Sequence, residues 1–560
     1  VINNGNLVFN RSDNLTVTGA MSGTGSLTQA GTGTLILASG ISGYTGTTTI
    51  SAGRLQIGDG STSGSVTGNI VNNAVLTFDF PNAITYTGVI SGTGSLTQSG
   101  AGTLTLAGIN TYTGPTTVSR GRLAINGSIT SNVTVAAGGE LSGSGTIFGV
   151  VTNNNIVAPG NSIGTLTVNG LYTQAVGSTY QVEVNAVGQN DRINVVGAPG
   201  TATINGGTAS VVAAVGVYAP STTYTILNAT GGVTGVYADV TSNLVFLLPT
   251  LTYDANNVYL TLKPGGFARG AQTNNQTAVG RVLDQSVAGA TGDLATVIGT
   301  MAALTQAQGQ AVMDAISGQQ YSGFGTANVA NSLMFMNVVG QQMAAARSGG
   351  GAGNRLALAA ACDVACDGED SSPWSLWASA LGGTGSVAGN GNSSTLTYNG
   401  GGFATGIDFR ADPRFLIGIG LGYASGNQWV NGFSGRGSSD SYQASLYASF
   451  TEAGFYADAL AGYGYNDNQM TRMIAIPGLQ ARTAKGRVGA DQFLAQAEAG
   501  YRLGVYQPAA ATLTPFARFQ TSTVTQGSFT ETGADSLNLN VAQQTTKSMR
   551  STLGAELAGT

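Results

Sequence analysis

Apolar and polar residues alternate along the first half of this 560-residue chain, and glycines interrupt the pattern every few positions. Leu104 and Leu106 flank Thr105, for example, and Leu35 and Leu37 show the same spacing. A period of two is typical of a β-strand with one buried face, and glycine marks the turns between strands. The pattern predicts short strands joined by turns over residues 1–263.

One long segment occurs twice. Residues 22–60 read SGTGSLTQAGTGTLILASGISGYTGTTTISAGRLQIGDG, and residues 91–128 read SGTGSLTQSGAGTLTLAGINTYTGPTTVSRGRLAINGS. The match extends upstream and divides the chain into repeats 1–68 and 69–128, displaced by 69 positions (71 − 2 = 69 for Val71 and Ile2). A long fixed period predicts stacked units that share one core. We expect a right-handed parallel β-helix in which each repeat makes three rungs of roughly 23 residues.

Beyond the repeats the pattern changes twice. Two closing strand groups, at about residues 221–263, form an expected cap, and Pro264-Gly265-Gly266 then breaks the alternation. Residues 264–372 show helical spacing and predict a short α-helical linker. Its last helix, residues 326–347, would be roughly 33 Å long, which is close to the thickness of a membrane core.

From residue 373 the alternation returns in longer windows. Five windows carry aromatic residues at the ends and small residues between them on one face, and polar residues on the other face: 403–410, 417–423, 442–450, 455–465 and 493–503. Lipid tolerates small residues at mid-strand, whereas a soluble core needs bulk there. The windows therefore favour an antiparallel transmembrane β-barrel over a soluble sheet with one wet face.

Composition excludes several functions. The chain has 26 acidic and 21 basic residues, a net charge of −5, so no nucleic-acid partner is expected. It contains no histidine, which excludes Ser-His-Asp catalysis and His-ligated metals among these residues. We predict no catalytic, metal or cofactor site, and therefore no enzyme within these residues. Asp191-Arg192 and the repeat-equivalent pair Arg54 and Arg122 are interpreted as turn and rung-edge residues.

Five features of the chain are taken together: the sequence of the repeats, the PGNSIGTL segment at residues 159–166, the YTILNATGGVTGVY closing segment, the helical linker and the alternating barrel strands. In these features the chain resembles the autotransporter (type V secretion) family. The resemblance implies an exported β-helical passenger at residues 1–263 and an outer-membrane translocator at residues 373–560. It also implies outer-membrane lipid, the barrel-assembly machinery and periplasmic chaperones as partners. The expected location is the outer membrane, with the passenger extracellular.

The resemblance departs from the family at the barrel. Autotransporter barrels close with twelve strands, whereas this sequence offers about eight candidates before Thr560, and Val1 falls within a repeat. We therefore expect the chain to be truncated at both ends and its barrel to be incomplete.

Candidate functional residues lie in the barrel and the linker. Charged residues on the polar strand faces are expected either to line and hydrate the pore or to be solvated without individual roles: Asp408, Arg410, Asp458, Glu498, Arg502 and Arg518. Residues 326–347 are expected either to fill the pore or to pack outside the barrel, and their polar positions are Asn331, Asn337, Gln341 and Gln342. Cys362 and Cys366 are expected to form a disulfide or to remain two unpaired thiols.

The leading interpretation is an outer-membrane autotransporter that exports and anchors its own passenger, which acts as an adhesin or a structural stalk. The passenger would then contact a host or neighbouring-cell surface ligand. The rival interpretation is the anchor and spacer of a surface enzyme, a protease or lipase, whose catalytic domain lies upstream of residue 1.

Overall fold

The computed structural model describes residues 1–38, 43–347, 355–356, 373–506 and 511–558. These residues form two compact units. Residues 1–270 with 283–307 make up what we call the β-helix unit, and residues 271–282 with 308–560 make up the barrel unit.

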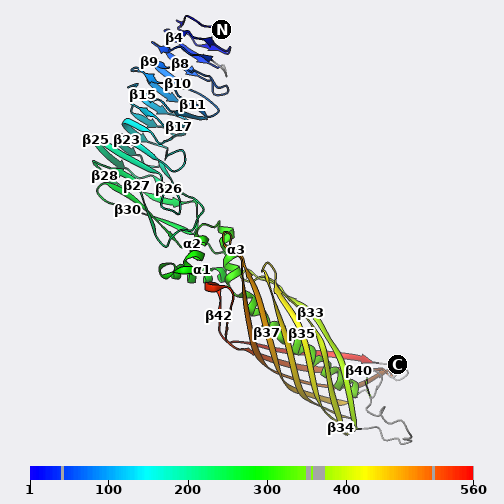
Figure 1. Ribbon diagram of the computed structural model, residues 1–560. Helices are drawn as coiled ribbons and strands as arrows, with labels where there is room; N and C mark the ends of the chain where they lie inside the picture. The colour runs from blue at the N-terminus through cyan, green and yellow to red at the C-terminus, as the bar shows by residue number, and fades with distance from the viewer. Residues whose placement is uncertain (39–42, 348–354, 357–372, 507–510, 559–560) are drawn as a thin grey trace. The chain divides into compact units, whose positions relative to one another are not determined.

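The β-helix unit stacks short parallel strands into three sheets (Figure 1). Sheet 1 comprises β1 (Asn6–Phe9), β4 (Ser26–Gln29), β7 (Thr48–Ile50), β9 (Ile70–Asn72) and β12 (Ile90–Ser91). Sheet 2 follows the path β2 (Leu15–Val17), β5 (Thr34–Leu37), β8 (Arg54–Ile57), β10 (Val75–Phe78), β13 (Ser95–Gln98), β16 (Thr116–Val118), β19 (Val133–Val135), β21 (Thr146–Asn153), β23 (Thr165–Gln174), β25 (Arg192–Ile204) and β27 (Thr222–Ala229). Sheet 3 comprises β11 (Ile84–Tyr86), β14 (Thr103–Leu106), β17 (Gly121–Ile125), β20 (Gly139–Gly143), β22 (Ile156–Pro159), β24 (Thr179–Val184), β26 (Thr208–Ala213) and β29 (Asp239–Ser242).

Smaller strands complete this unit. The pairs are β3 (Ser22–Gly23) with β6 (Gly43–Tyr44), β15 (Ile109–Asn110) with β18 (Ser128–Ile129), and β28 (Gly232–Gly235) with β25. The parallel stack ends where β27 pairs antiparallel with β31 (Asn257–Pro264), which in turn pairs antiparallel with β30 (Leu247–Tyr253). This hairpin occupies the last parallel edge, because that edge would otherwise offer unpaired N–H and C=O groups.

Stacked leucines fill the core of the β-helix unit. Leu35, Leu55, Leu76 and Leu96 are register partners on successive rungs, and each is at most 1% exposed. Their neighbours along each strand, such as Thr34, Ser95 and Thr97, are partly exposed, although Thr77 beside Leu76 is buried. The alternation in the sequence therefore corresponds to the buried and exposed faces of each strand.

The rungs are shorter than the sequence predicted. Ser26 pairs with Asn6, Thr48 with Leu27 and Ile70 with Thr48, which are offsets of 26 − 6 = 20, 48 − 27 = 21 and 70 − 48 = 22 positions. Leu27 therefore lies in sheet 1, whereas its repeat equivalent Leu96 lies in sheet 2. A 69-residue repeat therefore spans about three and one-third rungs, and equivalent strands of the two repeats lie in neighbouring sheets of the β-helix. The expectation of three rungs of 23 residues each was wrong. Three short strands and their turns fit within the smaller rung, and an apolar strand can be buried on any of the three faces.

Gly53 and Gly121 show that the two copies share backbone geometry. Their φ angles are +61° and +64°, in the left-handed region that favours glycine. A Cβ atom at Gly53 would lie 2.4 Å from the carbonyl oxygen of Gly31, and one at Gly121 would lie 2.3 Å from that of Gly100. Both turns therefore require glycine.

In the described part of the barrel unit, eight long antiparallel strands form one curved sheet. In order they are β33 (Trp374–Val387), β34 (Leu396–Asp412), β35 (Phe415–Val430), β36 (Gly435–Glu452), β37 (Phe455–Ile474), β38 (Arg482–Tyr501), β40 (Ala511–Gln526) and β43 (Gln544–Ala558). Short strands β32 (Arg355–Leu356) and β39 (Leu503–Tyr506) pair with β33 and β40, and β41 (Phe529–Thr530) pairs with β42 (Asn540–Val541). The long strands exceed the predicted windows because Ser, Asn, Gln and Thr residues continue the pairing beyond the apolar band.

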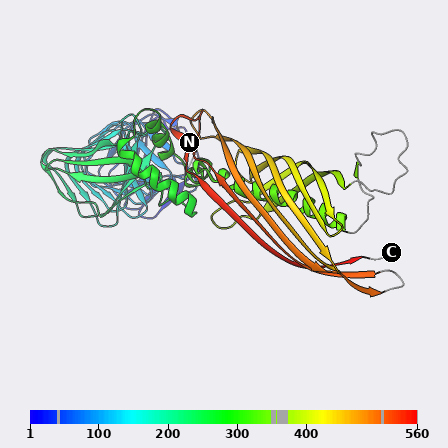
Figure 2. The same ribbon diagram turned by 90° about the horizontal axis from the view of Figure 1, so that it is seen from below.

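Helices connect the two strand regions. They are α1 (Asn274–Ser286), η1 (Val287–Gly289), α2 (Gly292–Ala302), α3 (Gln306–Ile316), η2 (Gln319–Ser322) and α4 (Gly323–Arg347), and η5 (Asp535–Leu537) lies in a barrel loop. Figure 2 shows α4 along the concave face of the curved sheet. None of the described helices is both long and apolar enough to cross a membrane.

Candidate functional site

Helix α4 packs on the inner face of the curved sheet through one apolar side. Phe335, Met336, Val339 and Met343 are fully buried there and share a core with inward residues of the strands, including Trp377, Leu381, Leu416, Leu460 and Leu494. The structure thus places residues 326–347 inside the sheet rather than outside it, in a helix that begins at Gly323.

Short polar side chains hold another part of α4. The Asn331 side-chain amide donates to the Ser441 hydroxyl at 3.2 Å, and the Ser439 hydroxyl donates to the side-chain Oδ1 of Asn328 at 2.8 Å. The Ser332 hydroxyl donates to that of Ser522 at 3.1 Å. Buried amides and hydroxyls need such partners, because an unpaired polar group costs about 1–3 kcal/mol. The helix is therefore too polar for lipid and is satisfied by the sheet.

Arginines hold the C-terminal end of α4. Arg347 forms a buried ion pair with Asp458, and its guanidinium lies 3.8 Å from the ring centroid of Tyr456. The Arg410 guanidinium donates to the carbonyl oxygen of Ala346 at 2.7 Å. A cation at this position satisfies a free carbonyl and complements the negative end of the helix dipole.

The other predicted residues divide into contacting and exposed positions. Asp408 accepts hydrogen bonds from Tyr447 and from the Gln342 amide, the latter at 2.8 Å. Glu498 accepts one from Tyr456 at 2.7 Å and pairs with Arg518. The Gln520 amide donates to Asn337 at 3.0 Å, Gln341 is exposed, and Arg502 lines a cavity of about 400 Å³ beside Arg347 and Glu556. Cys362 and Cys366 lie outside the described residues.

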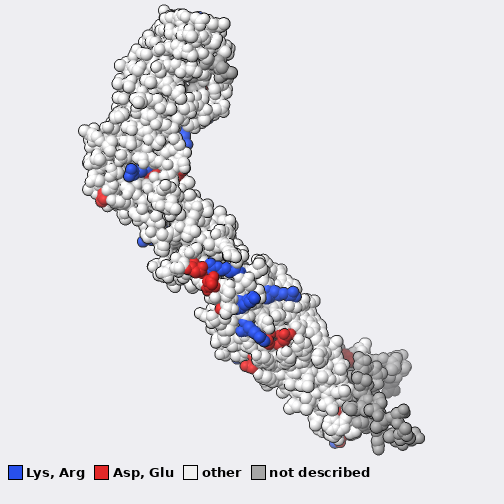
Figure 3. All heavy atoms as spheres, viewed as in Figure 1, with Lys and Arg blue, Asp and Glu red and all other residues white. Residues whose placement is uncertain are grey.

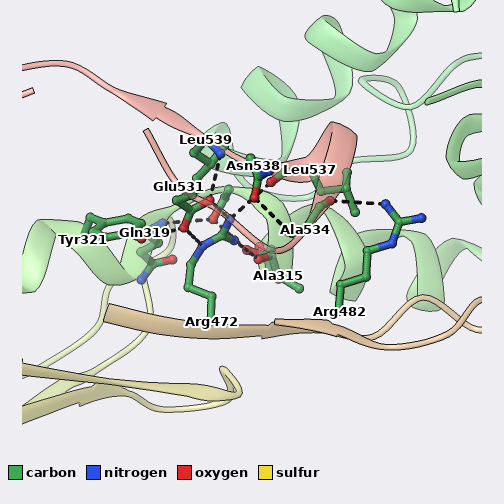
Figure 4. A network of polar contacts seen from close by, with 12 residues as sticks. Ala315, Gln319, Tyr321, Arg472, Arg482, Glu531, Ala534, Leu537, Asn538 and Leu539 are labelled. Carbon is green, nitrogen blue, oxygen red and sulfur yellow. Dashed lines mark hydrogen bonds and ion pairs between the residues drawn. The ribbon is translucent and has the colours of Figure 1, made fainter. Parts of the chain in front are cut away.

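A second cluster, at the other end of α4, was not anticipated from the sequence (Figure 4). Arg472 and Glu531 form a fully buried ion pair through two hydrogen bonds of 2.7 and 2.6 Å. The Tyr321 hydroxyl donates to the same carboxylate at 2.6 Å, and Arg472 also donates to the Ala315 carbonyl at 2.7 Å. The residues from η2 into α4 are thereby tied to β37 and to loop 527–543.

Hydrogen bonding sets the protonation of this cluster. Burial alone would raise the pKa of Glu531, but the bonds from Arg472 and Tyr321 outweigh it and hold that pKa below the ordinary value. The only signal in the sequence was the alternation of β37, which puts Arg472 on the inward face with Met470 and Ile474.

Two aromatic girdles bound the outer face of the sheet. One contains Phe403, Tyr423 and Tyr442, with neighbouring ring centroids 6.1 and 5.4 Å apart, and continues in Tyr463, Tyr465 and Phe493. The other contains the pairs Trp374–Phe409 and Phe415–Phe450, with centroids 4.6 and 4.8 Å apart. Tyr442 and Phe450 are eight residues apart on β36, about 26 Å along the strand and about 20 Å along the normal of a sheet tilted by ~40°. The band between the girdles, at about 20 Å, is close to the ~25 Å apolar height of an outer-membrane barrel.

The connections orient this sheet. At one end, turns 413–414 and 453–454 have two residues each, and the connection between β38 and β40 contains the short strand β39. At the opposite end, every connection is a loop, at residues 388–395, 431–434, 475–481 and 527–543. In outer-membrane barrels the short turns face the periplasm and the long loops face outward. Helix α4 therefore begins at the outer end and finishes, at Arg347, near the periplasmic end.

Comparisons with known proteins agree with this geometry. A family model described as "Autotransporter beta-domain" matches residues 376–560, and one described as "Passenger-associated-transport-repeat" matches residues 27–57 and 96–125. The chain belongs to the autotransporter family. The sheet of β33 to β43 is accordingly its translocator, lodged in the outer membrane, and the β-helix unit is its extracellular passenger.

Two curated proteins and one solved structure are similar to parts of this autotransporter. An "Extracellular serine protease" of Serratia marcescens is 36% identical over 178 residues, 29% of this chain and 16% of that protein. An "Adhesin BmaC autotransporter" of Brucella suis is 61% identical over 49 residues, 9% of this chain and 1% of that protein. The "Translocator domain of autotransporter NalP" from Neisseria meningitidis is 16% identical with a TM-score of 0.31, covering 41% of this chain and 71% of that structure. The chain thus spans only 16% and 1% of the lengths of the two curated relatives, the serine protease and the adhesin.

Proposed function

We propose that the passenger of this autotransporter acts as a surface adhesin or structural stalk and not as an enzyme. One observation carries the proposal. Outward threonines occupy the same column of sheet 2 on seven consecutive rungs: Thr97, Thr117, Thr134, Thr152, Thr173, Thr203 and Thr234. Strands in a sheet lie about 4.8 Å apart, so these hydroxyls repeat at that interval.

A repeating hydroxyl column suits contact with an extended surface. Each hydroxyl both donates and accepts a hydrogen bond, and the column carries no charge that would require a specific counterion. Catalysis instead needs a concave site with titratable groups of shifted pKa. The threonine column lies along a continuous sheet face of stacked strands, a geometry that supports a binding role for the passenger.

The adhesin proposal is tested on cells that carry the gene for this chain. Thr134, Thr152 and Thr173 are replaced together by valine, which favours β-structure but lacks the hydroxyl. We expect cell–cell or cell–surface attachment to fall to the level of cells that lack residues 1–263. Protease accessibility of the passenger on intact cells serves as the export control and should not change. Undiminished attachment by the triple variant would contradict the proposed role of the column.

A second candidate is the spacer and anchor of a surface enzyme. The similarity to a relative named as an extracellular serine protease favours it. Peptidase or esterase activity on the surface of cells that carry the gene, lost with a serine-directed inhibitor, would support this candidate. Attachment without such activity would support the adhesin.

Export is further proposed to depend on the barrel-assembly machinery and periplasmic chaperones. The β-helix unit is locally connected, since each rung contacts only its neighbours, so it can fold progressively from its C-terminal hairpin once outside. Depletion of the assembly machinery should remove the passenger from the cell surface while the precursor accumulates in the periplasm.

A further inference from the structure

Beyond the outer aromatic girdle, three adjacent strands present a grid of hydrogen-bond donors on their outer face. The first row is Arg436, Thr471 and Lys485, and the second row is Ser438, Gln469 and Arg487, each row following the register of β36, β37 and β38. We call these six residues the donor patch. Figure 3 shows basic side chains gathered on this end of the barrel.

The donor patch faces outward, because its neighbours in the alternation face the interior. Gly437 lies against Gln428 and Met470, and Gly486 lies against Tyr321 and Phe529. Arg436, Lys485 and Arg487 are exposed, and the side chain of Arg487 is 71% accessible. The patch is therefore open to a ligand outside the barrel.

The cations of the patch are only partly neutralised. Arg487 pairs with Asp467 through hydrogen bonds of 3.0 and 2.6 Å. In the part of the chain that the structure describes, neither Arg436 nor Lys485 forms a salt bridge. The nearby carboxylates lie nearer the girdle and already accept phenol hydroxyls: Asp440 from Tyr423 at 3.0 Å, and Asp491 from Tyr463. Two cations thus remain for an anion.

The spacing of the first row suits a phosphate group. Arg436 and Lys485 are two strands apart, about 10 Å between their backbones, and the Thr471 hydroxyl lies between them. A guanidinium, an ammonium and a hydroxyl can all donate to one phosphate, and arginine is suited to planar paired contacts with it.

The distance of the donor patch from the aromatic girdle indicates which kind of lipid can reach it. Arg436 lies six residues beyond Tyr442 on β36, about 20 Å along the strand and about 15 Å along the normal at ~40° tilt. The polar layer of an ordinary bilayer leaflet is only about 5–8 Å thick. We propose that the donor patch binds the phosphate groups of an outer-leaflet lipid with a large headgroup, a phosphorylated glycolipid.

The test uses the whole chain extracted from outer membranes in detergent, with purified lipopolysaccharide as the probe. We expect the double variant Arg436→Gln, Lys485→Gln to bind roughly tenfold to thirtyfold more weakly, from the contribution of each basic residue near an anionic surface. Arg414→Gln is the matched control, because Arg414 is an exposed arginine in the periplasmic turn and should leave binding unchanged.

Further arms distinguish the sources of phosphate. Chemically dephosphorylated lipopolysaccharide and phosphatidylglycerol vesicles should bind the unaltered protein as weakly as the double variant binds the intact glycolipid. Inorganic phosphate at millimolar concentration should compete poorly. Equal binding of the dephosphorylated glycolipid, or equal binding by the double variant, would overturn the proposal. If the double variant does not reach the membrane, the dephosphorylated probe and the salt dependence of binding by the unaltered protein decide the question.

Discussion

Asp191 is a buried carboxylic acid in the turn between β24 and β25. Only 1% of the residue is exposed, and its two oxygens accept the backbone N–H groups of Gly164 and Glu183, both at 2.8 Å. Burial raises its pKa to about 7 despite these bonds. The residue therefore fastens the segment before β23 to the end of β24 at the cost of burying an ionisable group.

The raised pKa makes the β-helix unit less stable as pH rises. The folded state binds more protons than the unfolded state between pH ~4 and ~7, so the free energy of unfolding falls across this interval by up to about 4 kcal/mol and levels off above it. Urea unfolding of residues 1–307 at pH 4.5, 6 and 8 measures the slope. Asp191→Asn should remove most of it.

Asp254→Asn provides the control. Asp254 is exposed and its pKa is lowered to about 2 by hydrogen bonds from Asn256, Asn257 and Tyr259, so it stays ionised throughout this pH range. The slope should survive in that variant. A slope that persists in Asp191→Asn would show that another group is responsible.

The sequence placed Asp191 and Arg192 in a turn but gave no indication of burial. Their neighbours Gly188, Gln189 and Asn190 are polar or flexible, which is typical of an exposed loop. Burial arises because the turn folds back onto the segment before β23, at a sequence distance that local pattern cannot show. The lumen residues were easier to predict, since alternation alone puts Asp408, Asp458 and Glu498 on the inner face.

At the level of elements, the Arg472–Glu531 pair should determine how firmly loop 527–543 and η2 are held at the outer end of the barrel. Glu531→Gln leaves Arg472 buried without a counter-charge, a change that typically costs about 3–5 kcal/mol. We expect faster amide hydrogen exchange in loop 527–543 and η2, and greater entry of small antibiotics into cells. Acid should act in the same direction, because the lowered pKa of Glu531 means that its stabilisation is lost as pH falls below about 4.5.

Asp535→Asn is the control for the outer end. Asp535 lies in the same loop, its side chain is 75% exposed, and it approaches Arg482 only at 3.9 Å. Its replacement should change exchange little. If Glu531→Gln and Asp535→Asn behave alike, the buried pair does not hold the loop.

The apolar–polar pattern of the sequence predicted some parts of the barrel strands and of α4 but not others. Aromatic ends and small residues marked the lipid-facing part of each strand, but the outer halves of β37 and β38 carry Asn, Gln and Thr on both faces. The apolar–polar alternation of the sequence is therefore weak there, although the inward Asn466 and Asn468 are fully buried. Helix α4 could be located from its helical spacing, and its polar interruptions indicated a position away from lipid. Its partners could not be located, because Asn328, Ser439 and Asn468 meet only once the sheet is curved.

For the β-helix unit, the relation between repeat and rung gives a test of register. Register partners on successive rungs are offset by 26 − 6 = 20 to 70 − 48 = 22 positions, so the 69-residue repeat equals about three and one-third rungs. Deleting residues 27–95 joins Ser26 directly to Leu96, which is the repeat equivalent of Leu27. Every later strand then still has a strand to pair with on the preceding rung. Stacking should survive, since Leu96 then meets Leu7 as it normally meets Leu76.

We therefore expect this deletion to shorten the unit by about 16 Å, from three and one-third strand spacings of ~4.8 Å, while it still unfolds cooperatively. Small-angle scattering and thermal unfolding of residues 1–307 with and without residues 27–95 provide the measurement. The control deletion removes residues 27–49, one third of a repeat, and joins strands that have no equivalence in sequence. It moves apolar residues off their stacked positions, so it should broaden or abolish the transition, because a slip in register exposes the buried face. If the 23-residue deletion is tolerated as well as the 69-residue one, the relation of three and one-third rungs per repeat would be contradicted. The result would instead favour three rungs of 23 residues in each repeat.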